Sequence, residues 1–220
     1  VTGASRGLGL ALTRALSERG WRLAVDARGA EALEKAVAGL PGVAAIAGDV
    51  ADSDHRRRLV ESAGRPIDLL VNNASLLGPS PLPLLTRYSL EDLRSVYEAN
   101  VFAPLALVQL SAPRFAPHAR VINLVSDAAF EAYEAWGGYG SSKAALAHIT
   151  AVLGAEHPGL RIYAVDPGDM RTQMQQDAFP GEDVSDRAPP EESVPGLLTL
   201  IEGDLPSGLY RARDLVGASA

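Results

Sequence analysis

The stretch Thr2-Gly3-Ala4-Ser5-Arg6-Gly7-Leu8-Gly9 decides the fold of this chain. Its glycines have the spacing TGxxxGxG, and the apolar residues that follow have the 3–4 periodicity of a helix. Glycines let the backbone approach a pyrophosphate closely, and the first turn of the helix offers its free amide groups to the negative charge. The stretch therefore predicts a dinucleotide-binding turn, although a glycine turn that joins a strand to a helix and binds no ligand also fits this motif alone.

The rest of the chain alternates strand and helix patterns. Short apolar runs predict buried strands at Leu23–Ala27, Val43–Ala47, Ile67–Val71, Val121–Val125 and Ile162–Val165. Helical spacing predicts helices at Leu8–Arg19, Glu31–Gly39, Asp54–Ser62, Leu90–Leu110 and Tyr139–Glu156. This order is typical of an α/β fold, a doubly wound parallel sheet with helices on both faces and ligands beyond the carboxyl ends of its strands.

The 220 residues fit a single domain that spans residues 1–220. Only Val1 precedes the glycine turn, where a central strand is expected, so we expect the first strand to be truncated at the N-terminus. Residues 173–193 are polar and acidic and contain prolines, which favours a mobile loop or lid on the substrate side. Residues 202–220 show no clear glycine-rich closing strand.

Composition excludes several classes of function. The 20 basic and 27 acidic residues give a net charge of −7, which argues against nucleic acid or an anionic membrane as the main partner. Without cysteine there is no disulfide, zinc–thiolate site or thiol nucleophile, and the four histidines lack the spacing of metal ligands. No apolar stretch approaches the length of a membrane span, so we expect a cytoplasmic protein without a metal site. The run Arg56–Arg58 fans around a helix and is interpreted as solvated.

Tyr139 and Lys143 lie four positions apart at the start of a predicted helix, which places the phenol and the ammonium group on one face. A cation so placed favours the phenolate and lowers the pKa of the phenol, as a general acid for a carbonyl or a base for an alcohol requires. The chain contains 18 arginines and only two lysines. One of these two lysines lies at this position, which favours a specific role for it. An ordinary surface pair is the alternative that spacing alone allows.

Two further polar residues lie where the predicted sheet would present a site. Ser126 directly follows the strand Val121–Val125, at the carboxyl edge where parallel sheets bind their ligands. Asn100 lies within an otherwise apolar helix pattern, where an amide is costly unless it is hydrogen-bonded. A satisfied core amide explains Asn100 as well as a functional role does.

Taken in order, these motifs resemble those of the short-chain dehydrogenase/reductase family over nearly the whole chain. The resemblance implies a Rossmann-like fold and hydride transfer between a nicotinamide cofactor and a small-molecule carbonyl or alcohol substrate. It implies that Tyr139 is the acid/base, that Lys143 holds the nicotinamide ribose and lowers the pKa of Tyr139, and that Ser126 polarises the substrate carbonyl. Asn100 would hold a water molecule that links Lys143 to solvent.

The same resemblance implies the residues that bind the cofactor. The glycine turn would hold the pyrophosphate, Asp49 and Val50 would contact the adenine, and residues 72–74 would pack along the cofactor. Residues 167–172 would border the nicotinamide amide. The predicted cofactor-binding set is Gly3, Ser5, Arg6, Gly7, Leu8, Gly9, Arg28, Asp49, Val50, Asn73, Ala74, Tyr139, Lys143, Pro167, Gly168 and Thr172.

The end of the strand Leu23–Ala27 bears on the choice of cofactor. An unphosphorylated ribose is often bound by an acidic residue about 20 positions past the glycines, and Asp26 can be interpreted in that way. In the family that this chain resembles, however, that acid matches Ala27, and Arg28 follows it. The guanidinium groups of Arg28 and Arg6 suit a 2′-phosphate in charge and geometry, unless both are ordinary solvated residues. We therefore expect NADP(H) rather than NAD(H).

Two positions depart from the family pattern. Ser75 stands where the family usually has the glycine of NNAG, so the local backbone or the access of the substrate can differ. Asp127 follows Ser126 where a small residue is usual. It is either a solvated turn residue or a charge that disfavours anionic substrates.

Aromatic residues precede Tyr139 at Phe130, Tyr133 and Trp136. Together with residues 76–85 they either line a pocket for an apolar or aromatic substrate or belong to the core. Residues 90–110 and 144–156 are apolar on more than one helix face, and the family resemblance implies a subunit interface there. We expect at least a homodimer, with a tetramer as the larger alternative.

The sequence thus predicts an NADP(H)-dependent oxidoreductase that interconverts a ketone or an aldehyde with its alcohol. A non-catalytic dinucleotide-binding sensor that retains the fold is one alternative, and an assembly protein without a cofactor is another. The presence of Ser126, Tyr139, Lys143 and Asn100 together argues against the sensor, and the glycine turn argues against the assembly protein.

Overall fold

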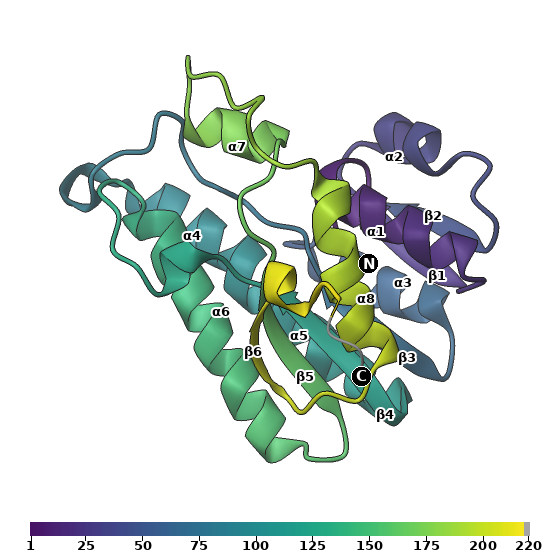
Figure 1. The fold of residues 1–220 in the computed structure, drawn as a ribbon. Coiled ribbons are helices and arrows are strands. Elements are labelled where there is room, and N and C mark those ends of the chain that lie inside the picture. Colours follow the sequence, from purple (N-terminus) through teal and green to yellow (C-terminus); the bar gives the residue numbers. More distant parts are fainter. Residues whose placement is uncertain (218–220) are drawn as a thin grey trace.

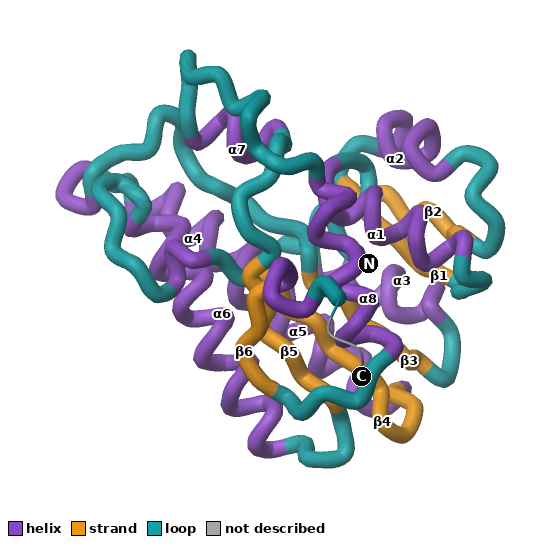
Figure 2. The backbone as a smooth tube through the Cα atoms, viewed as in Figure 1, coloured by secondary structure: helices purple, strands orange, loops and turns teal. Residues whose placement is uncertain are grey.

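The computed structural model describes residues 1–217 and shows parallel strands between two layers of helices (Figure 1). Figure 2 separates the central strands from the loops that gather at one end of the sheet. Strands β1 and β2 pair in parallel, and β3, β4, β5 and β6 form a second parallel group in that order. Their bounds are β1 Leu23–Ala27, β2 Val43–Ala47, β3 Ile67–Asn72, β4 Phe115–Leu124, β5 Arg161–Asp166 and β6 Gly208–Arg211.

Val1 and Thr2 lie between the two groups of strands and join them. The amide of Asp26 in β1 donates to the carbonyl of Val1 at 3.3 Å, and the amide of Thr2 donates to the carbonyl of Val71 in β3 at 3.0 Å. The glycine turn therefore starts at the centre of the sheet, where a doubly wound fold binds its ligand.

The helices form two layers because the strands carry apolar side chains on both faces. Ile122 and Tyr163 belong to a core formed with α1, α2 and α8, whereas the adjacent Val121 and Ile162 belong to a core formed with α3, α5 and α6. The bounds are α1 Gly7–Glu18, α2 Ala30–Val37, α3 Ser53–Ala63, α4 Leu90–Tyr97, α5 Ala103–Ser111, α6 Gly137–Glu156, α7 Gln173–Ala178 and α8 Val194–Glu202. The predicted α/β fold is confirmed.

The structure corrects the sequence prediction for three elements. The expectation of no closing strand was wrong: β6 pairs with β5, but its residues alternate between half-buried and exposed, so they leave no apolar run. Helix α8 was missed because Pro195 and Gly196 interrupt its pattern; a Cβ on Gly196 would lie 2.0 Å from the carbonyl oxygen of Ala212. The predicted helix 90–110 is interrupted by a π-helical turn, Glu98–Phe102.

Residues 173–193 are more ordered than a loop. They contain α7 and a 3₁₀ turn, and Met170 forms an isolated parallel bridge with Ala188. The Ser80 hydroxyl donates to the carbonyl of Asp177 at 2.6 Å, which ties this segment to the loop after β3. Figure 1 shows α7 above the carboxyl ends of the strands. No helix within residues 1–217 combines the length and apolarity needed to cross a membrane.

Candidate active site

The glycine turn is shaped by close approaches of the backbone. Gly3 and Gly7 have φ of +70° and +57°, in the left-handed region that favours glycine. A Cβ on Gly9 would lie 2.3 Å from the carbonyl oxygen of Gly3 and 2.5 Å from Nδ2 of Asn73. Arg6 is the N-cap of α1 and makes no side-chain cap, and the first turn holds no acidic residue. The first amide groups of α1 are thus available to an anion.

Residues after β3 fasten this turn. The Asn73 side-chain amide donates to the carbonyls of Thr2 at 2.8 Å and of Gly3 at 3.2 Å. The backbone amides of Asn73 and Ala74 both donate to Thr2 Oγ1 at 2.9 Å. The structure therefore brings the predicted residues Gly3, Asn73 and Ala74 together, and it gives Asn73 a structural task that the sequence did not indicate.

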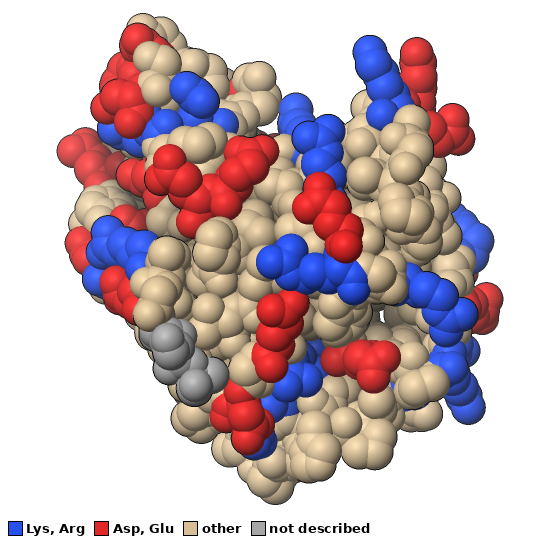
Figure 3. All heavy atoms as spheres, turned by 45° about the vertical axis from the view of Figure 1, so that its right-hand side comes forward, with Lys and Arg blue, Asp and Glu red and all other residues tan. Residues whose placement is uncertain are grey.

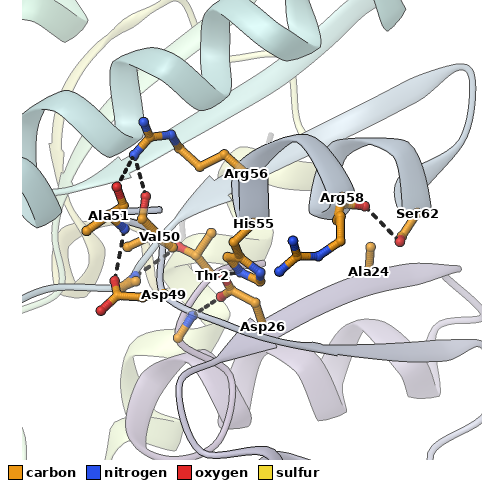
Figure 4. A network of polar contacts seen from close by, with 12 residues as sticks. Thr2, Ala24, Asp26, Asp49, Val50, Ala51, His55, Arg56, Arg58 and Ser62 are labelled. Atoms are coloured by element: carbon orange, nitrogen blue, oxygen red, sulfur yellow. Dashed lines mark hydrogen bonds and ion pairs between the residues drawn. The ribbon is translucent and has the colours of Figure 1, made fainter. Parts of the chain in front are cut away.

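Asp26 and His55 form a buried pair beneath the glycine turn (Figure 4). Oδ1 of Asp26 accepts a hydrogen bond from the Gly3 amide at 2.8 Å, and Oδ2 lies 2.9 Å from Nε2 of His55. Their side chains are 1% and 0% exposed, so neither carboxylate oxygen is free for a ribose hydroxyl. Sequence reasoning missed this role; the available signal was that His55 shares the buried face of α3 with Leu59.

Arg56 clamps the predicted adenine-side loop. Its guanidinium donates to the carbonyls of Val50 at 2.6 Å and Ala51 at 3.1 Å (Figure 4). It also donates to the Glu98 carboxylate at 3.3 Å. The interpretation of the arginine run as solvated was therefore wrong for Arg56, whose side chain is 11% exposed. Arg57 and Arg58 are exposed as predicted.

Arg6 and Arg28 are both exposed, and Arg28 directly follows β1. Basic and acidic side chains are interspersed over the face of the molecule drawn in Figure 3. Ser5 is half-buried, Leu8 is buried in the core below the turn, and Asp49 is exposed. Because the Leu8 side chain is buried, Leu8 can contact a cofactor only through its backbone.

The loop after β5 faces the glycine turn. A Cβ on Gly7 would lie 3.5 Å from Cγ2 of Thr172, so these two predicted segments are neighbours. Thr172 caps α7 by accepting a hydrogen bond from the Gln175 amide, and the carbonyl of Pro167 accepts one from Ser193. Gly168 has φ of +79° and donates its amide to Asp166 Oδ1.

Tyr139 and Lys143 lie one turn apart on the buried face of α6, with Lys143 Nζ 5.5 Å from the centroid of the phenol ring. Nζ donates to the carbonyl of Leu124 at 2.7 Å. Burial lowers the pKa of Lys143 to about 7. Burial raises the pKa of Tyr139, the charges of Asp166 and Asp127 add to that rise, and hydrogen bonds with Ser75 and Ser126 oppose it. The surface-pair alternative is excluded, since both side chains are buried.

Ser126 lies two residues beyond β4 and begins the 3₁₀ turn Asp127–Ala129. Its hydroxyl donates to Asp127 Oδ1 at 2.8 Å and accepts from the Ala128 amide at 3.2 Å. The hydroxyl of Tyr133 donates to the other oxygen of Asp127 at 3.1 Å. Asp127 is thus bound to Ser126 rather than merely solvated, which places a carboxylate beside the predicted site.

Asn100 lies in the π-helical turn and is fully buried. Its Oδ1 accepts from the Leu76 amide at 2.7 Å and the Ser75 hydroxyl at 3.1 Å. Its Nδ2 donates to the Leu76 carbonyl and to Ser142 Oγ, both at 2.9 Å. The side chain uses its full hydrogen-bonding capacity to tie the loop after β3 to α6.

Apolar side chains surround the Tyr139 ring. Trp136 packs edge-on against Tyr139 at 5.9 Å between centroids and contacts Phe179 at 5.8 Å, so the segment after β5 closes over this cluster. Leu77 and Met174 complete it from the two tied loops. Phe130 and Tyr133 are 54% and 44% exposed. A cavity of about 570 Å³ lies elsewhere, between α6 and the strands β5 and β6.

Comparisons with known proteins identify the family of this chain. The family model described as short chain dehydrogenase matches residues 1–183. Gluconate 5-dehydrogenase of Gluconobacter oxydans is 31% identical over 197 residues, which cover 84% of this chain and 76% of that protein. Benzil reductase of Saccharomyces cerevisiae is 30% identical over 192 residues, which cover 80% of this chain and 73% of that protein.

Solved structures extend the similarity to the whole fold. A short chain dehydrogenase from Escherichia coli CFT073 complexed with NADPH superimposes with a TM-score of 0.88 at 26% identity, over 97% of this chain and 95% of that one. One from Shigella flexneri complexed with NADP gives a TM-score of 0.87 at 26% identity, with 97% and 95% covered. This chain therefore belongs to the short-chain dehydrogenase/reductase family of NAD(P)-binding oxidoreductases.

Proposed function

We propose that this protein is an NADP(H)-dependent enzyme that interconverts an apolar or aromatic ketone or aldehyde with its alcohol. One observation carries the proposal: Tyr139, Lys143 and Ser126 meet in a mostly apolar enclosure at the carboxyl end of the sheet. An acid/base phenol, a buried cation and a polarising hydroxyl are what carbonyl reduction demands of a protein.

The residues present fit a phosphorylated dinucleotide. The uncapped N-terminus of α1 and the glycine turn suit the pyrophosphate. Both oxygens of Asp26 are already bonded, so the usual acidic partner of an unphosphorylated ribose is not offered there. Arg28, exposed at the end of β1, instead offers a guanidinium to a 2′-phosphate. The two structural relatives complexed with NADPH and NADP support the same choice.

The bound cofactor would supply the hydride, and the chain supplies the proton and its placement. The Ser126 proton would turn from Asp127 toward the substrate oxygen. The Tyr139 hydroxyl would bind the same oxygen and give its proton to it during reduction. In the reverse direction the Tyr139 phenolate would take the proton from the alcohol. Lys143, buried one turn away, would stabilise that phenolate when it is charged, and Asn100 would fix the geometry of the neighbouring loop.

The walls of the site favour a neutral substrate with apolar groups. Trp136, Phe179 and Leu77 surround the phenol, and the Asp127 carboxylate beside Ser126 would repel an anion. Benzil reductase, one of the relatives, carries the name of such an aromatic diketone, whereas gluconate is an anion. An aromatic ketone or diketone is therefore the first substrate class to test.

Two expectations beyond the site belong to the same proposal. Residues 173–193 would act as the lid, because they reach the loop after β3 through Ser80 and Asp177 and through the packing around Trp136. The small-residue face of α6 beside β6 would pack against a second copy of the chain, giving at least a dimer. Light scattering at micromolar concentration tests the second expectation, and a monomeric mass would refute it.

The activity is tested by cofactor consumption. The protein is mixed separately with NADPH and NADH against aromatic and aliphatic ketones and aldehydes, with Tyr139→Phe as the matched control. We expect turnover with NADPH and an aromatic carbonyl that disappears in the control. Binding of NADPH without turnover across a broad panel would instead favour the non-catalytic sensor.

A further inference from the structure

Asp26, near the end of β1, binds two successive amides of the glycine turn. Its side-chain Oδ1 accepts a hydrogen bond from the Gly3 amide at 2.8 Å, and its backbone carbonyl accepts one from the Ala4 amide at 2.8 Å. These two amides belong to the peptide groups on either side of the Gly3 Cα. Because glycine adopts many backbone conformations, the two bonds select the one with φ of +70° that the turn contains.

His55 fixes the Asp26 carboxylate from the other side. The two side chains point toward one another, with Nε2 of His55 2.9 Å from Oδ2 of Asp26 (Figure 4). An ionised carboxylate only accepts hydrogen bonds, so Nε2 carries the proton that joins them. The imidazole packs against the backbone at Gly48, where a Cβ would collide with the ring. A buried carboxylate is stable only when it is bonded in this way.

The pair joins two segments of the predicted cofactor site. Asp26 binds the glycine turn, whereas His55 lies in the first turn of α3, shortly after the predicted adenine contact Asp49. The Gly48 amide also donates to the carbonyl of Ala27, the last residue of β1, at 3.0 Å. Hydrogen bonds of the chain itself therefore fix both segments to the end of β1.

Neither side chain can touch a cofactor directly. Asp26 and His55 are 1% and 0% exposed, and both carboxylate oxygens are hydrogen-bonded within the protein. The pair can therefore affect the cofactor only through the conformation of the turn. When a ligand binds one conformation, its apparent dissociation constant rises as the fraction of molecules in that conformation falls. A turn that is already formed thus binds more tightly than one that the ligand must order.

We propose that Asp26 and His55 are positioning residues of the cofactor site, which hold the glycine turn in its NADPH-binding conformation before the cofactor arrives. The proposal rests on the proposed function, because it needs NADPH to bind at the glycine turn. It concerns binding and leaves the proton transfer at Tyr139 unchanged.

The first test is amide hydrogen exchange in the ¹⁵N-labelled wild type, measured with and without NADPH. We expect the Gly3 amide to exchange as slowly as the amides of β1 before NADPH is added. Rapid exchange that becomes slow only with NADPH would overturn the proposal, because the cofactor would then form the turn. This measurement needs no variant, so it decides the question even if a variant does not fold.

The second test compares NADPH binding by Asp26→Ala and Asp26→Asn in a fluorescence titration. Asp26→Ala removes the acceptor of the Gly3 amide, so we expect binding about tenfold weaker, with a matching rise in KM for NADPH and the same kcat at saturation. The Asn73 side chain still holds the carbonyls of Thr2 and Gly3, so the turn is loosened rather than lost. Asp26→Asn keeps an oxygen for the Gly3 amide and is expected to restore most of the affinity.

The matched control is Ser17→Ala. Ser17 is buried near the opposite end of α1 from the glycine turn, and its hydroxyl donates to the carbonyl of Pro41 at 2.8 Å. The variant loses a buried hydrogen bond, so we expect lower stability with unchanged NADPH affinity. Equal weakening of NADPH binding in Ser17→Ala and Asp26→Ala would overturn the proposal, because a general loss of stability would explain both.

The titration also separates this proposal from the proposed function. A wild type that does not bind NADPH would refute the proposed function, and the role of the pair with it. A wild type that binds NADPH, together with an Asp26→Ala variant that binds it equally tightly, would refute the role of the pair alone.

Discussion

Two regions of this molecule bury polar side chains beside a functional loop, and they use them differently. Under the glycine turn, both oxygens of the Asp26 carboxylate are hydrogen-bonded, one to the Gly3 amide and the other to His55. Around Tyr139, the buried ammonium group of Lys143 donates to the carbonyl of Leu124, and burial lowers the pKa of Lys143 to about 7. The comparison teaches that burial of a polar group does not mark a reactive site. A buried titratable group whose pKa is shifted toward neutral pH is the better indicator.

The Asp26 and His55 pair should therefore matter for stability far more than for chemistry. Asp26→Ala leaves His55 buried without its partner and frees the Gly3 amide, and breaking a buried pair costs about 3–5 kcal/mol. We expect the free energy of unfolding in urea to fall by that amount while the folded fraction retains Tyr139-dependent turnover. Asp68→Ala, an exposed aspartate on β3, is the control and should change stability by less than about 0.5 kcal/mol. Equal effects of the two variants would remove the contrast between the regions.

Arg28, which is exposed directly after β1, tests whether the region around the glycine turn binds the 2′-phosphate of NADPH. Arg28→Ala should weaken NADPH binding by about tenfold and leave NADH binding unchanged, because only NADPH carries the 2′-phosphate. Fluorescence titration of each cofactor measures both constants. Arg22, exposed at the other end of the same strand, supplies the control, and Arg22→Ala should affect neither cofactor. If NADPH affinity survives in Arg28→Ala, the cofactor choice must be assigned to other residues.

Arg56 connects the two regions and should give the smallest effect. It joins the loop at Val50 to Glu98, which begins the π-helical turn that carries Asn100. Arg56→Ala is expected to cost about 1 kcal/mol in urea unfolding. Arg57→Ala removes only an exposed pair with Asp54 and should cost less. A larger loss of unfolding free energy in Arg57→Ala than in Arg56→Ala would contradict the role of Arg56 in joining Val50 to Glu98.

Sequence reasoning anticipated the elements that carry strong local patterns. The strands β1 and β2 have the predicted bounds because mostly apolar runs between turn residues leave few alternatives. The prediction that β2 is buried was wrong, since its residues are half-buried or exposed at the edge of the sheet. The glycine turn and the pair at Tyr139 and Lys143 were found because fixed spacings express local geometry. The edge strand β6 was not predicted, because a half-exposed strand has no continuous apolar run.

The rest of the site depends on contacts between distant segments, which no spacing encodes. Asp26 meets His55 across 29 residues, and Asn100 meets Ser75 across 25 residues and Ser142 across 42. His55 looked like one of four unremarkable histidines, and Ser75 looked like a departure from a motif. Their partners are brought to them only by the packing of α3 and α6 against the sheet.

The role of Tyr139 as the acid/base is tested most directly by one paired measurement on the wild type and Tyr139→Phe: NADPH affinity by titration, and NADPH-dependent reduction of an aromatic diketone. Tyr139→Phe removes only the phenolic hydroxyl and keeps the glycine turn and Arg28, so the variant should still bind NADPH and lose about 10²- to 10⁴-fold in turnover. Turnover close to that of the wild type would contradict the assignment of Tyr139 as the acid/base.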